Sequence, residues 1–389
     1  MRSELQRSSH GYSLIELLIS LTIGLVIIGA AVNMFSKSMD ATWVVSQRAE
    51  LQQDARATSN LITKDISLAG AGMPPGGVAL VSGGGVLAPR YGCDMNSICY
   101  LGANNVASIA FPTQTVGANT INYLYGAIPG WQKGVTIAPA ITATDVMTVV
   151  YADTAFLLSD YHVMANDVNG NSVTFTLPVP APNPLDQAVN NPGVGLQKGD
   201  IVLFTTTSGG SALAEVTAAV AAGGGPYTVA FASGSALLLN QNAGTSGNIK
   251  NAILGGAAQA PANVGVDLTN KMGLIATRVW MITYYIDNTG TTPTMMRQVN
   301  ARIPVPVAEN VADLRFTYDT YDDSGNLLNA TGDGGMGNVP PISPGSIRRI
   351  NMTHLTLRSQ LPGVKGGYQS MDLQTSISAR NMSFIDRYK

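Results

Sequence analysis

The sequence has few charged side chains: they make up 12% of its 389 residues, 22 of them basic and 24 acidic. The net charge of −2 argues against a protein that binds nucleic acid through a strong positive field, so we expect no nucleic-acid partner. A weakly charged chain that is rich in glycine, alanine, serine and threonine is more typical of exported β-rich proteins than of cytosolic enzymes.

Catalytic motifs are missing as well. None of the three histidines, His10, His162 and His354, lies in a recognisable motif, and the sequence contains no G-x-S-x-G, H-E-x-x-H or phosphate-loop pattern. We therefore predict that the chain is not an enzyme and that it holds no cofactor.

One group of acidic residues is a weak candidate for a calcium site. Asp319, Asp322 and Asp323 lie close together in the sequence with Asn326, but their spacing does not fit an EF-hand loop. A solvated hairpin turn is the simpler interpretation of this group, and the calcium hypothesis stays open beside it.

The chain has two cysteines, Cys93 and Cys99, which are close enough in sequence to close one short loop. In an exported domain such a pair is expected to form a disulfide, and the alternative is a pair of free thiols. Because no histidine lies near them in the sequence, the two cysteines do not form a zinc site.

Near the N-terminus the composition changes sharply. Residues 1–11 are polar and include Arg2 and Arg7, whereas the stretch from Leu17 to Ser36 contains no charged residue. As a helix this stretch would be about 30 Å long, which is roughly the thickness of the hydrocarbon core of a bilayer. The basic residues before it and the long polar region after it predict a cytoplasmic N-terminus and an exported remainder.

Three interpretations of this segment compete: a cleaved secretory signal peptide, a plain membrane anchor, and a prepilin signal that is cut after Gly11. Glu16 distinguishes them, because a carboxylate within an apolar run is costly in lipid unless it is paired. Cleavage after Gly11 would create a free α-amino group on Tyr12, and in a filament that positive N-terminus can neutralise Glu16 of a neighbouring subunit. A signal peptide or a plain anchor offers no such partner.

The residues from Gly11 to Glu16 resemble the class III signal of type IV pilins and pseudopilins, which reads glycine, aromatic residue, serine or threonine, leucine, aliphatic residue, glutamate. The chain has Tyr12 where phenylalanine is usual. The resemblance implies cleavage after Gly11 by prepilin peptidase and N-methylation of Tyr12. It also implies an inner-membrane subunit with a single membrane pass, whose domain lies in the periplasm before it enters a pilus on the cell surface.

Beyond Ser36 the apolar residues recur at helical spacing on one face. This face consists of Val44, Leu51, Ala55, Thr58, Ile62, Ile66 and Ala69. The sequence Gly70-Ala-Gly-Met-Pro-Pro75 then ends the helix. We therefore predict one helix over residues 12–70, with residues 12–36 in the membrane or in a filament core, and with the apolar face of its second half packed on a globular domain.

The remaining residues, 71–389, predict a β-rich domain outside the cytoplasm, so the expected fold class is α+β. An insertion is expected at about 178–270, and within it residues 205–250 carry very little charge; they fit either an inserted β module or a disordered loop. Three sequences read as hairpin loops, at 167–170, 287–290 and 322–325. The predicted strands are Val106–Phe111, Val146–Tyr151, Ser172–Leu177, Ile201–Thr207, Arg278–Asp287, Met295–Ala301, Val311–Asp319, Arg348–Arg358 and Met371–Asn381.

Several blocks of this region are also similar to PilW-type minor pilins, among them the helix end at 51–70 and the strands at 145–151, 278–287, 309–318 and 348–359. This resemblance implies a structural part in pilus assembly or priming, and hence in adhesion and twitching motility. The implied partners are major and minor pilins, prepilin peptidase and the inner-membrane assembly platform. The alternatives are a type II secretion pseudopilin, which is typically shorter, and a membrane-tethered binding module.

Overall fold

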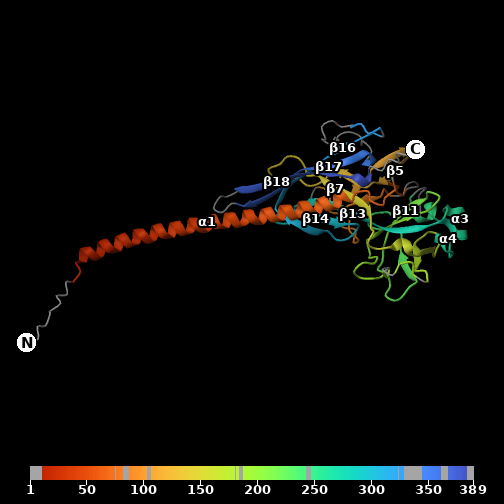
Figure 1. The fold of residues 1–389 in the computed structure, drawn as a ribbon, viewed down its shortest axis with the longest axis horizontal. Coiled ribbons are helices and arrows are strands. Elements are labelled where there is room, and N and C mark those ends of the chain that lie inside the picture. The colour runs from red at the N-terminus through yellow and green to blue at the C-terminus, as the bar shows by residue number, and fades with distance from the viewer. Residues whose placement is uncertain are drawn as a thin grey trace, which may run out of the picture. The chain divides into compact units, whose positions relative to one another are not determined.

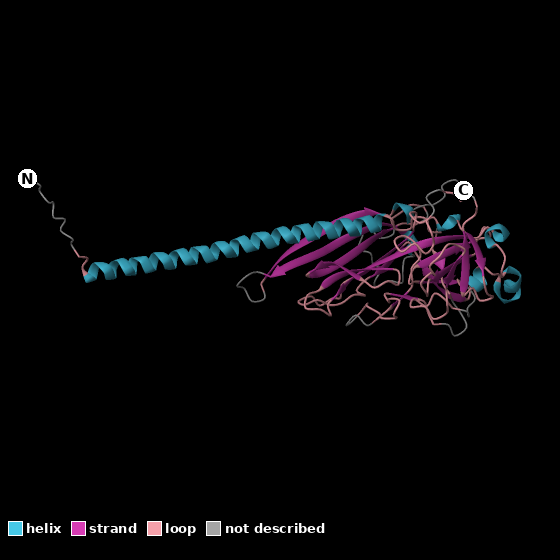
Figure 2. Ribbon diagram, turned by 90° about the horizontal axis from the view of Figure 1, so that it is seen from below, coloured by secondary structure: helices cyan, strands magenta, loops and turns pink. Residues whose placement is uncertain are grey.

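The computed structural model describes residues 11–74, 76–81, 87–102, 107–179, 181–183, 187–241, 247–322, 324–327, 344–360 and 367–382. It contains one long N-terminal helix followed by a region built mainly of β-strands (Figure 2), which confirms the α+β class expected from the sequence. The described chain divides into two compact units. One unit contains the chain up to Gln53 together with Ser359–Gln369, and the other contains Asp54–Arg358 and the chain from Ser370 onward.

The helix α1 runs without interruption from Leu14 to Ser67 (Figure 1). No proline lies between Tyr12 and Met73, so every residue of this stretch can take part in helical hydrogen bonding. In the second half of α1, one face is buried at spacings of three and four residues, as the sequence predicts. This buried face consists of Leu51, Ala55, Thr58, Ile62, Asp65 and Ile66.

The chain leaves α1 through a close approach of two glycines. Gly70 adopts a φ of 79°, and its amide donates to the carbonyl of Val150 at 2.8 Å. A Cβ atom at Gly126 would lie 2.5 Å from the Cα of Gly70, so a larger residue does not fit there without a shift of the backbone. This contact fixes the position at which the helix end joins the β region.

The largest sheet has seven strands and is organised around the thirteen-residue strand β13. β13 pairs antiparallel with β7, β10 and β14 over different stretches of its length. β11 and β15 extend the sheet beyond β10 and β14, and β6 pairs with β7. The strands are β6 (Ala127–Gly130), β7 (Val146–Ala152), β10 (Ile201–Thr205), β11 (Ser211–Glu215), β13 (Ile275–Asp287), β14 (Thr294–Val299) and β15 (Val305–Glu309).

Two hydrophobic cores lie on opposite faces of the β10–β11 hairpin. Because side chains alternate across a strand, Ile201 and Leu203 face one core, while Val202 and Phe204 face the other. The core that contains Ile201 and Leu203 also contains residues from β7 and β13. The core that contains Val202 and Phe204 is built from apolar residues scattered through the chain between Phe156 and Ala276. Residues 201–215, which fall in the range of the expected insertion, are therefore part of the central sheet.

A separate three-stranded sheet has the order β16-β17-β18, and two further three-stranded sheets have the orders β12-β9-β8 and β1-β5-β4. The strands of these sheets, and of the short pair β2–β3, are β1 (Val78–Ala79), β2 (Arg90–Tyr91), β3 (Ile109–Ala110), β4 (Thr113–Val116), β5 (Asn119–Leu124), β8 (His162–Ala165), β9 (Ser172–Thr176), β12 (Tyr227–Ala230), β16 (Val311–Thr320), β17 (Ile347–Gln360) and β18 (Tyr368–Ser378). The short helices are α2 (Ile249–Ala252), α3 (Gly256–Asn263), α4 (Leu268–Met272) and the 3-10 turns η2 (Leu158–Asp160), η3 (Pro344–Ser346) and η4 (Arg380–Met382).

Every strand predicted from the sequence overlaps a strand of the structure, and the predicted loops at 167–170 and 287–290 join antiparallel neighbours. The sequence did not predict β1, β2, β4, β5, β6, β8, β11, β12 and β15. Most of these strands are short, and several carry polar or small residues or a proline, so their sequences lack the apolar run that indicates a strand.

Candidate functional site

The residues of the N-terminal motif form the beginning of α1. Gly11, Tyr12 and Ser13 precede the helix and are exposed. The Ser13 carbonyl accepts hydrogen bonds from the amides of Glu16 and Leu17 at 3.0 and 3.1 Å, and its hydroxyl accepts from the amide of Ile15 at 3.3 Å. Ser13 is therefore the N-cap of α1, which leaves the Gly11–Tyr12 peptide bond outside the helix and accessible.

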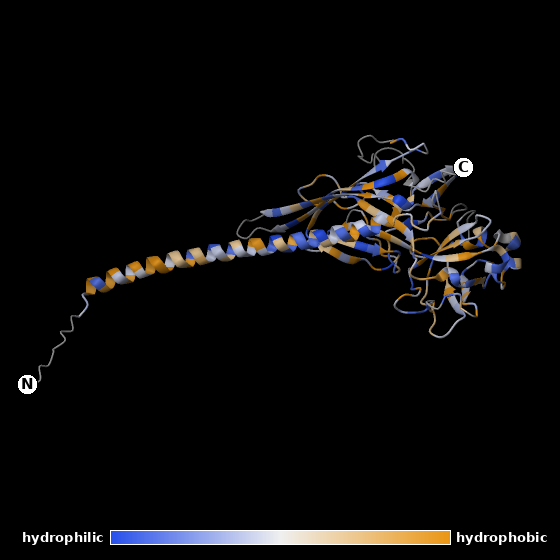
Figure 3. Ribbon diagram, viewed as in Figure 1, coloured by the Kyte–Doolittle hydropathy of each residue, from blue (hydrophilic) through white to orange (hydrophobic). Residues whose placement is uncertain are grey.

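The first half of α1 exposes apolar side chains on all sides. Leu14 is 80% exposed, Val26 is 72% exposed and Met34 is 77% exposed. Figure 3 shows the corresponding run of hydrophobic residues along this half of the helix. The segment is long and apolar enough to cross a membrane, with a mean hydropathy of 2.4 over its most apolar window. An all-round apolar helix is stable only in lipid or in a dry protein assembly.

Two hydroxyl groups in this segment form hydrogen bonds within the helix itself. Ser20 donates to the carbonyl of Glu16, and Thr22 donates to the carbonyl of Ile19 at 2.8 Å. Glu16 is the only ionisable residue between Leu14 and Ser36. Its position in the first turn is favourable for a negative charge because of the helix dipole. Within the part of the chain that the structure describes, no salt bridge includes its carboxylate.

Near the C-terminal end of α1, the acidic residue Asp65 binds the helix to the β domain. Its side chain is buried, and its Oδ2 atom accepts hydrogen bonds from the Tyr284 hydroxyl at 2.5 Å and from Arg297 Nε at 2.8 Å. Tyr284 lies in β13 and Arg297 lies opposite it in β14. The carboxylate thus joins α1 to both strands through charge-assisted hydrogen bonds.

The electrostatics of this contact keep its two donors protonated. Burial raises the pKa of Tyr284 far above its ordinary value, and the nearby charge of Asp65 raises it further. For Arg297, burial lowers the pKa, but the hydrogen bond and the charge of Asp65 outweigh it and raise the pKa overall. Tyr284 and Arg297 therefore remain protonated and act as donors to the carboxylate. This role of Asp65 was not predicted from the sequence, where the only local sign of it is an acid on the apolar face three residues after Ile62, with no indication of its partners.

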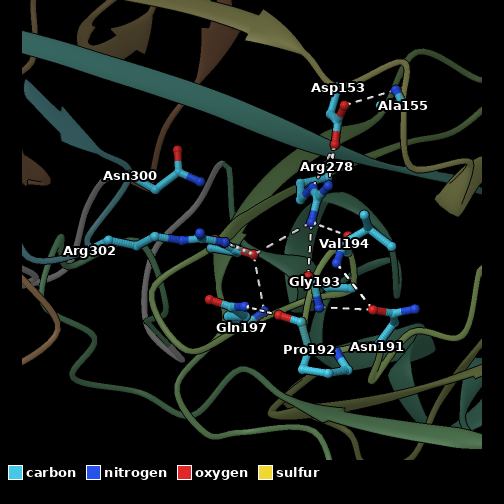
Figure 4. A network of polar contacts seen from close by, with 12 residues as sticks. Asp153, Ala155, Asn191, Pro192, Gly193, Val194, Gln197, Arg278, Asn300 and Arg302 are labelled. Atoms are coloured by element: carbon cyan, nitrogen blue, oxygen red, sulfur yellow. Dashed lines mark hydrogen bonds and ion pairs between the residues drawn. The ribbon is translucent and has the colours of Figure 1, made fainter.

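A second polar network lies deeper in the β domain (Figure 4). Arg278 forms a salt bridge with Asp153, and its Nη1 atom donates to the carbonyls of Val194 and Gly195 at 2.7 and 2.9 Å. Its guanidinium group also lies over the rings of Phe156 and Trp280, at 4.8 and 4.4 Å from their centroids.

The same network includes Asp200, which Arg302 binds through two hydrogen bonds of 2.8 Å. Burial raises the pKa of Asp200, and the charge of Arg302 opposes this shift. Arg278 and Asp200 are almost completely buried and their polar atoms are engaged by protein groups. Such an arrangement joins the chain around Val194 to the central sheet.

The remaining candidate residues lie apart from one another. His162 pairs with Asp267 at 2.7 Å, and His354 pairs with Asp372 at 2.8 Å, whereas His10 lies outside the described residues. Among the described residues, no group of three histidine, cysteine, aspartate or glutamate side chains is placed to hold a metal ion.

Two members of the calcium candidate, Asp319 and Asp322, contact other protein groups. Asp319 contacts Arg349 at 3.4 Å. Asn326 donates from its side-chain Nδ2 to Asp322 Oδ2 at 2.9 Å and from its amide to Oδ1 at 2.7 Å, and these two hydrogen bonds lower the pKa of Asp322. Asp323 lies outside the described residues. The contacts of Asp322 are those of a hairpin turn.

Cys93 and Cys99 form a disulfide in the structure. The loop that they close is attached to the central sheet on the side of β14. Gln298 donates from Nε2 to the carbonyl of Cys93 at 3.0 Å, and the Met95 amide donates to the carbonyl of Ala301 at 2.6 Å. The disulfide therefore stabilises a surface loop and lies far in sequence from the N-terminal motif.

Comparison with known families shows that residues 6–32 match the prokaryotic N-terminal methylation motif. The N-terminus carries a prepilin-type signal. The matched residues include Gly11, Tyr12 and Glu16 and most of the exposed apolar helix, so the motif and the structure point to the same segment. Together they support a type IV pilin-like or pseudopilin-like protein and are consistent with anchoring in a membrane. No curated protein and no solved structure matches the chain.

Proposed function

We propose that the chain is a minor type IV pilin, a structural subunit that functions by assembly and not by catalysis. The observation that carries this proposal is the carboxylate of Glu16, which has no salt-bridge partner among the described residues, at the start of a helix whose first half exposes apolar residues on all sides. In a filament, such helices bury their apolar surfaces against one another, and each Glu16 gains a positively charged partner.

Processing supplies that partner. Prepilin peptidase cuts after Gly11, the new N-terminus is methylated on Tyr12, and its positive charge pairs with Glu16 of an adjacent subunit. Before assembly, residues 12–36 hold the protein in the inner membrane with the β domain in the periplasm. The inner-membrane assembly platform then transfers it to a pilus that contains major and minor pilins. We favour a minor pilin over a type II secretion pseudopilin because the chain, at 389 residues, is long for the latter. The PilW-like blocks support the same choice.

The experiment compares Glu16→Ala with Glu50→Ala. Both residues lie in α1, but Glu50 lies beyond the apolar segment and is exposed. We expect both variants to insert into membranes as the wild type does, while only Glu16→Ala reduces the amount of the protein in sheared filaments by at least about tenfold, because it leaves the positive N-terminus of an adjacent subunit without its partner in a dry core, which costs several kcal/mol. Equal filament content of the two variants would contradict the proposal.

A further inference from the structure

The sheet formed by β16, β17 and β18 ends in a long strand with an open edge. β18 has eleven residues, and its only neighbour in the sheet among the described residues is β17. Contacts between the two strands show an antiparallel pair: His354 of β17 contacts Asp372, and Asn351, earlier in β17, contacts Ser376, later in β18. In such a pair every second residue of the terminal strand directs its amide and carbonyl groups away from its neighbour.

The other terminal strands of the described sheets are short or covered. β1, β4, β8, β11 and β12 have at most five residues each. β15 also has only five residues, and it contains Pro306 and pairs with β14 through an irregular register. Short length, proline and irregularity are devices that keep an edge from pairing with another chain. β16 has ten residues, but Asp145 occupies the middle of its edge. The Asp145 amide donates to the carbonyl of Leu314 at 2.9 Å, and its Oδ2 atom accepts from the amide of Phe316 at 2.8 Å.

β18 is long, and its eleven residues contain no proline and no glycine. A charged side chain is another common protection of an edge, and β18 has one, Asp372. Its carboxylate is engaged by the neighbouring strand, through His354 at 2.8 Å and the Thr356 hydroxyl at 3.0 Å. The remaining exposed side chains of β18 are uncharged, among them Ser370 and Gln374.

The position of β18 relates it to the segment that would enter an assembly. Its first two residues, Tyr368 and Gln369, belong to the same compact unit as the exposed part of α1. In that unit the Ser359 hydroxyl donates to Gln47 of α1 at 2.9 Å. An adjacent subunit that packs on α1 would thus reach the beginning of β18.

From this geometry we propose that β18 accepts an extended strand of an adjacent subunit when the protein assembles. This inference rests on the proposed function as a filament subunit. Recognition is through backbone hydrogen bonds, as in other cases of strand addition, and the uncharged side chains of β18 suit a partner strand with polar, uncharged residues. The helices would then supply the apolar contact, and β18 would fix the register between neighbouring β domains.

Amide hydrogen exchange on the full-length protein tests this inference. The protein in isolated filaments is compared with the same protein as a detergent-solubilised monomer. In the monomer every second amide of residues 369–378 should exchange rapidly. In filaments those same amides should exchange at least about tenfold more slowly, because they gain hydrogen bonds. Equal exchange in both states would overturn the inference, and so would uniform slowing of consecutive amides, which indicates covering without strand pairing.

A pair of variants provides the matched test. Gln374→Lys places a charge on β18, while Thr120→Lys places the same charge at an exposed strand position of a different sheet. The first should lower filament content at least about tenfold and abolish the alternating protection, and the second should change neither. Ser370→Lys replaces Gln374→Lys if the latter does not fold. If Glu16→Ala blocks assembly but wild-type β18 gains no protection in filaments, only the strand inference fails. If Glu16→Ala assembles normally, the proposed function fails.

Discussion

The Tyr284 hydroxyl donates a hydrogen bond of 2.5 Å to the carboxylate of Asp65, and so joins the central sheet to the second half of α1. The two residues are 219 positions apart in the sequence, and Arg297 binds the same carboxylate oxygen at 2.8 Å.

Replacement of Asp65 by alanine should destabilise the protein strongly. It leaves the buried hydroxyl of Tyr284 and the half-buried guanidinium of Arg297 without their partner, which typically costs about 3 to 5 kcal/mol. Denaturant unfolding of the detergent-solubilised protein measures this cost. Asp54→Ala, at an exposed position of the same helix, is the control and should change the free energy of unfolding by less than about 0.5 kcal/mol. A similar small change for Asp65→Ala would show that the contact does not hold the helix.

Stability should fall as the pH rises above 5, because of Glu215. Burial raises the pKa of this carboxyl from 4.5 to about 7, against hydrogen bonds led by that from the Leu237 amide, which lower it. A folded-state pKa above the unfolded value means that the protonated form favours folding. The contribution is therefore complete below about pH 4.5 and is lost as the pH rises through about 7.

The variant Glu215→Gln should remove this dependence while it keeps the side-chain oxygen that Leu237 binds. The size of the Glu215 pKa shift sets the expected effect: in Glu215→Gln, the difference in unfolding free energy between pH 5 and pH 8 should be about 2 to 3 kcal/mol smaller than in the wild type. Glu309→Gln, on the exposed face of β15, is the matched control and should leave the wild-type difference in place. An unchanged pH dependence in Glu215→Gln would contradict the assignment.

Reduction of the disulfide should lower stability by about 2 kcal/mol, the amount expected for a loop as short as that between Cys93 and Cys99. The double variant Cys93→Ser, Cys99→Ser should show the same loss without any reductant. Denaturant unfolding with and without dithiothreitol measures the effect, and the double variant should be insensitive to the reagent. A wild-type protein that is equally stable in both conditions would mean that the thiols are free or that the loop does not depend on them.

The sequence predicted α1 well because its signals are local. The proline-free stretch, the apolar run and the glycines from Gly70 onward lie within the helix or beside it. Strands such as β7 and β13 were predicted for the same reason, since their apolar residues are continuous. The six residues of β5, Asn119–Leu124, include only three apolar side chains, and β11 has a single large apolar residue, Leu213, among serine, alanine and glutamate, so neither has a strong local pattern.

The residues of the candidate site also differ in whether the sequence alone could identify them. Gly11, Tyr12 and Glu16 form a contiguous motif, which sequence reasoning can identify. Asp65 could not be assigned a role, because its partners come from strands more than 200 residues away. Asp200 and Arg278 are likewise brought together only by the pairing of β10 with β13. Long-range polar contacts depend on the register of the sheets, and a single sequence does not contain that information in local form.

The chemical state of the N-terminus tests the central claim most directly. The protein should be isolated from the membrane fraction of cells that contain prepilin peptidase, and its N-terminal peptide should be analysed by mass spectrometry. The account predicts a chain that begins at an N-methylated Tyr12 and retains the whole apolar segment. A chain that retains Met1, or one that begins beyond the apolar segment, near Val32, would contradict the account.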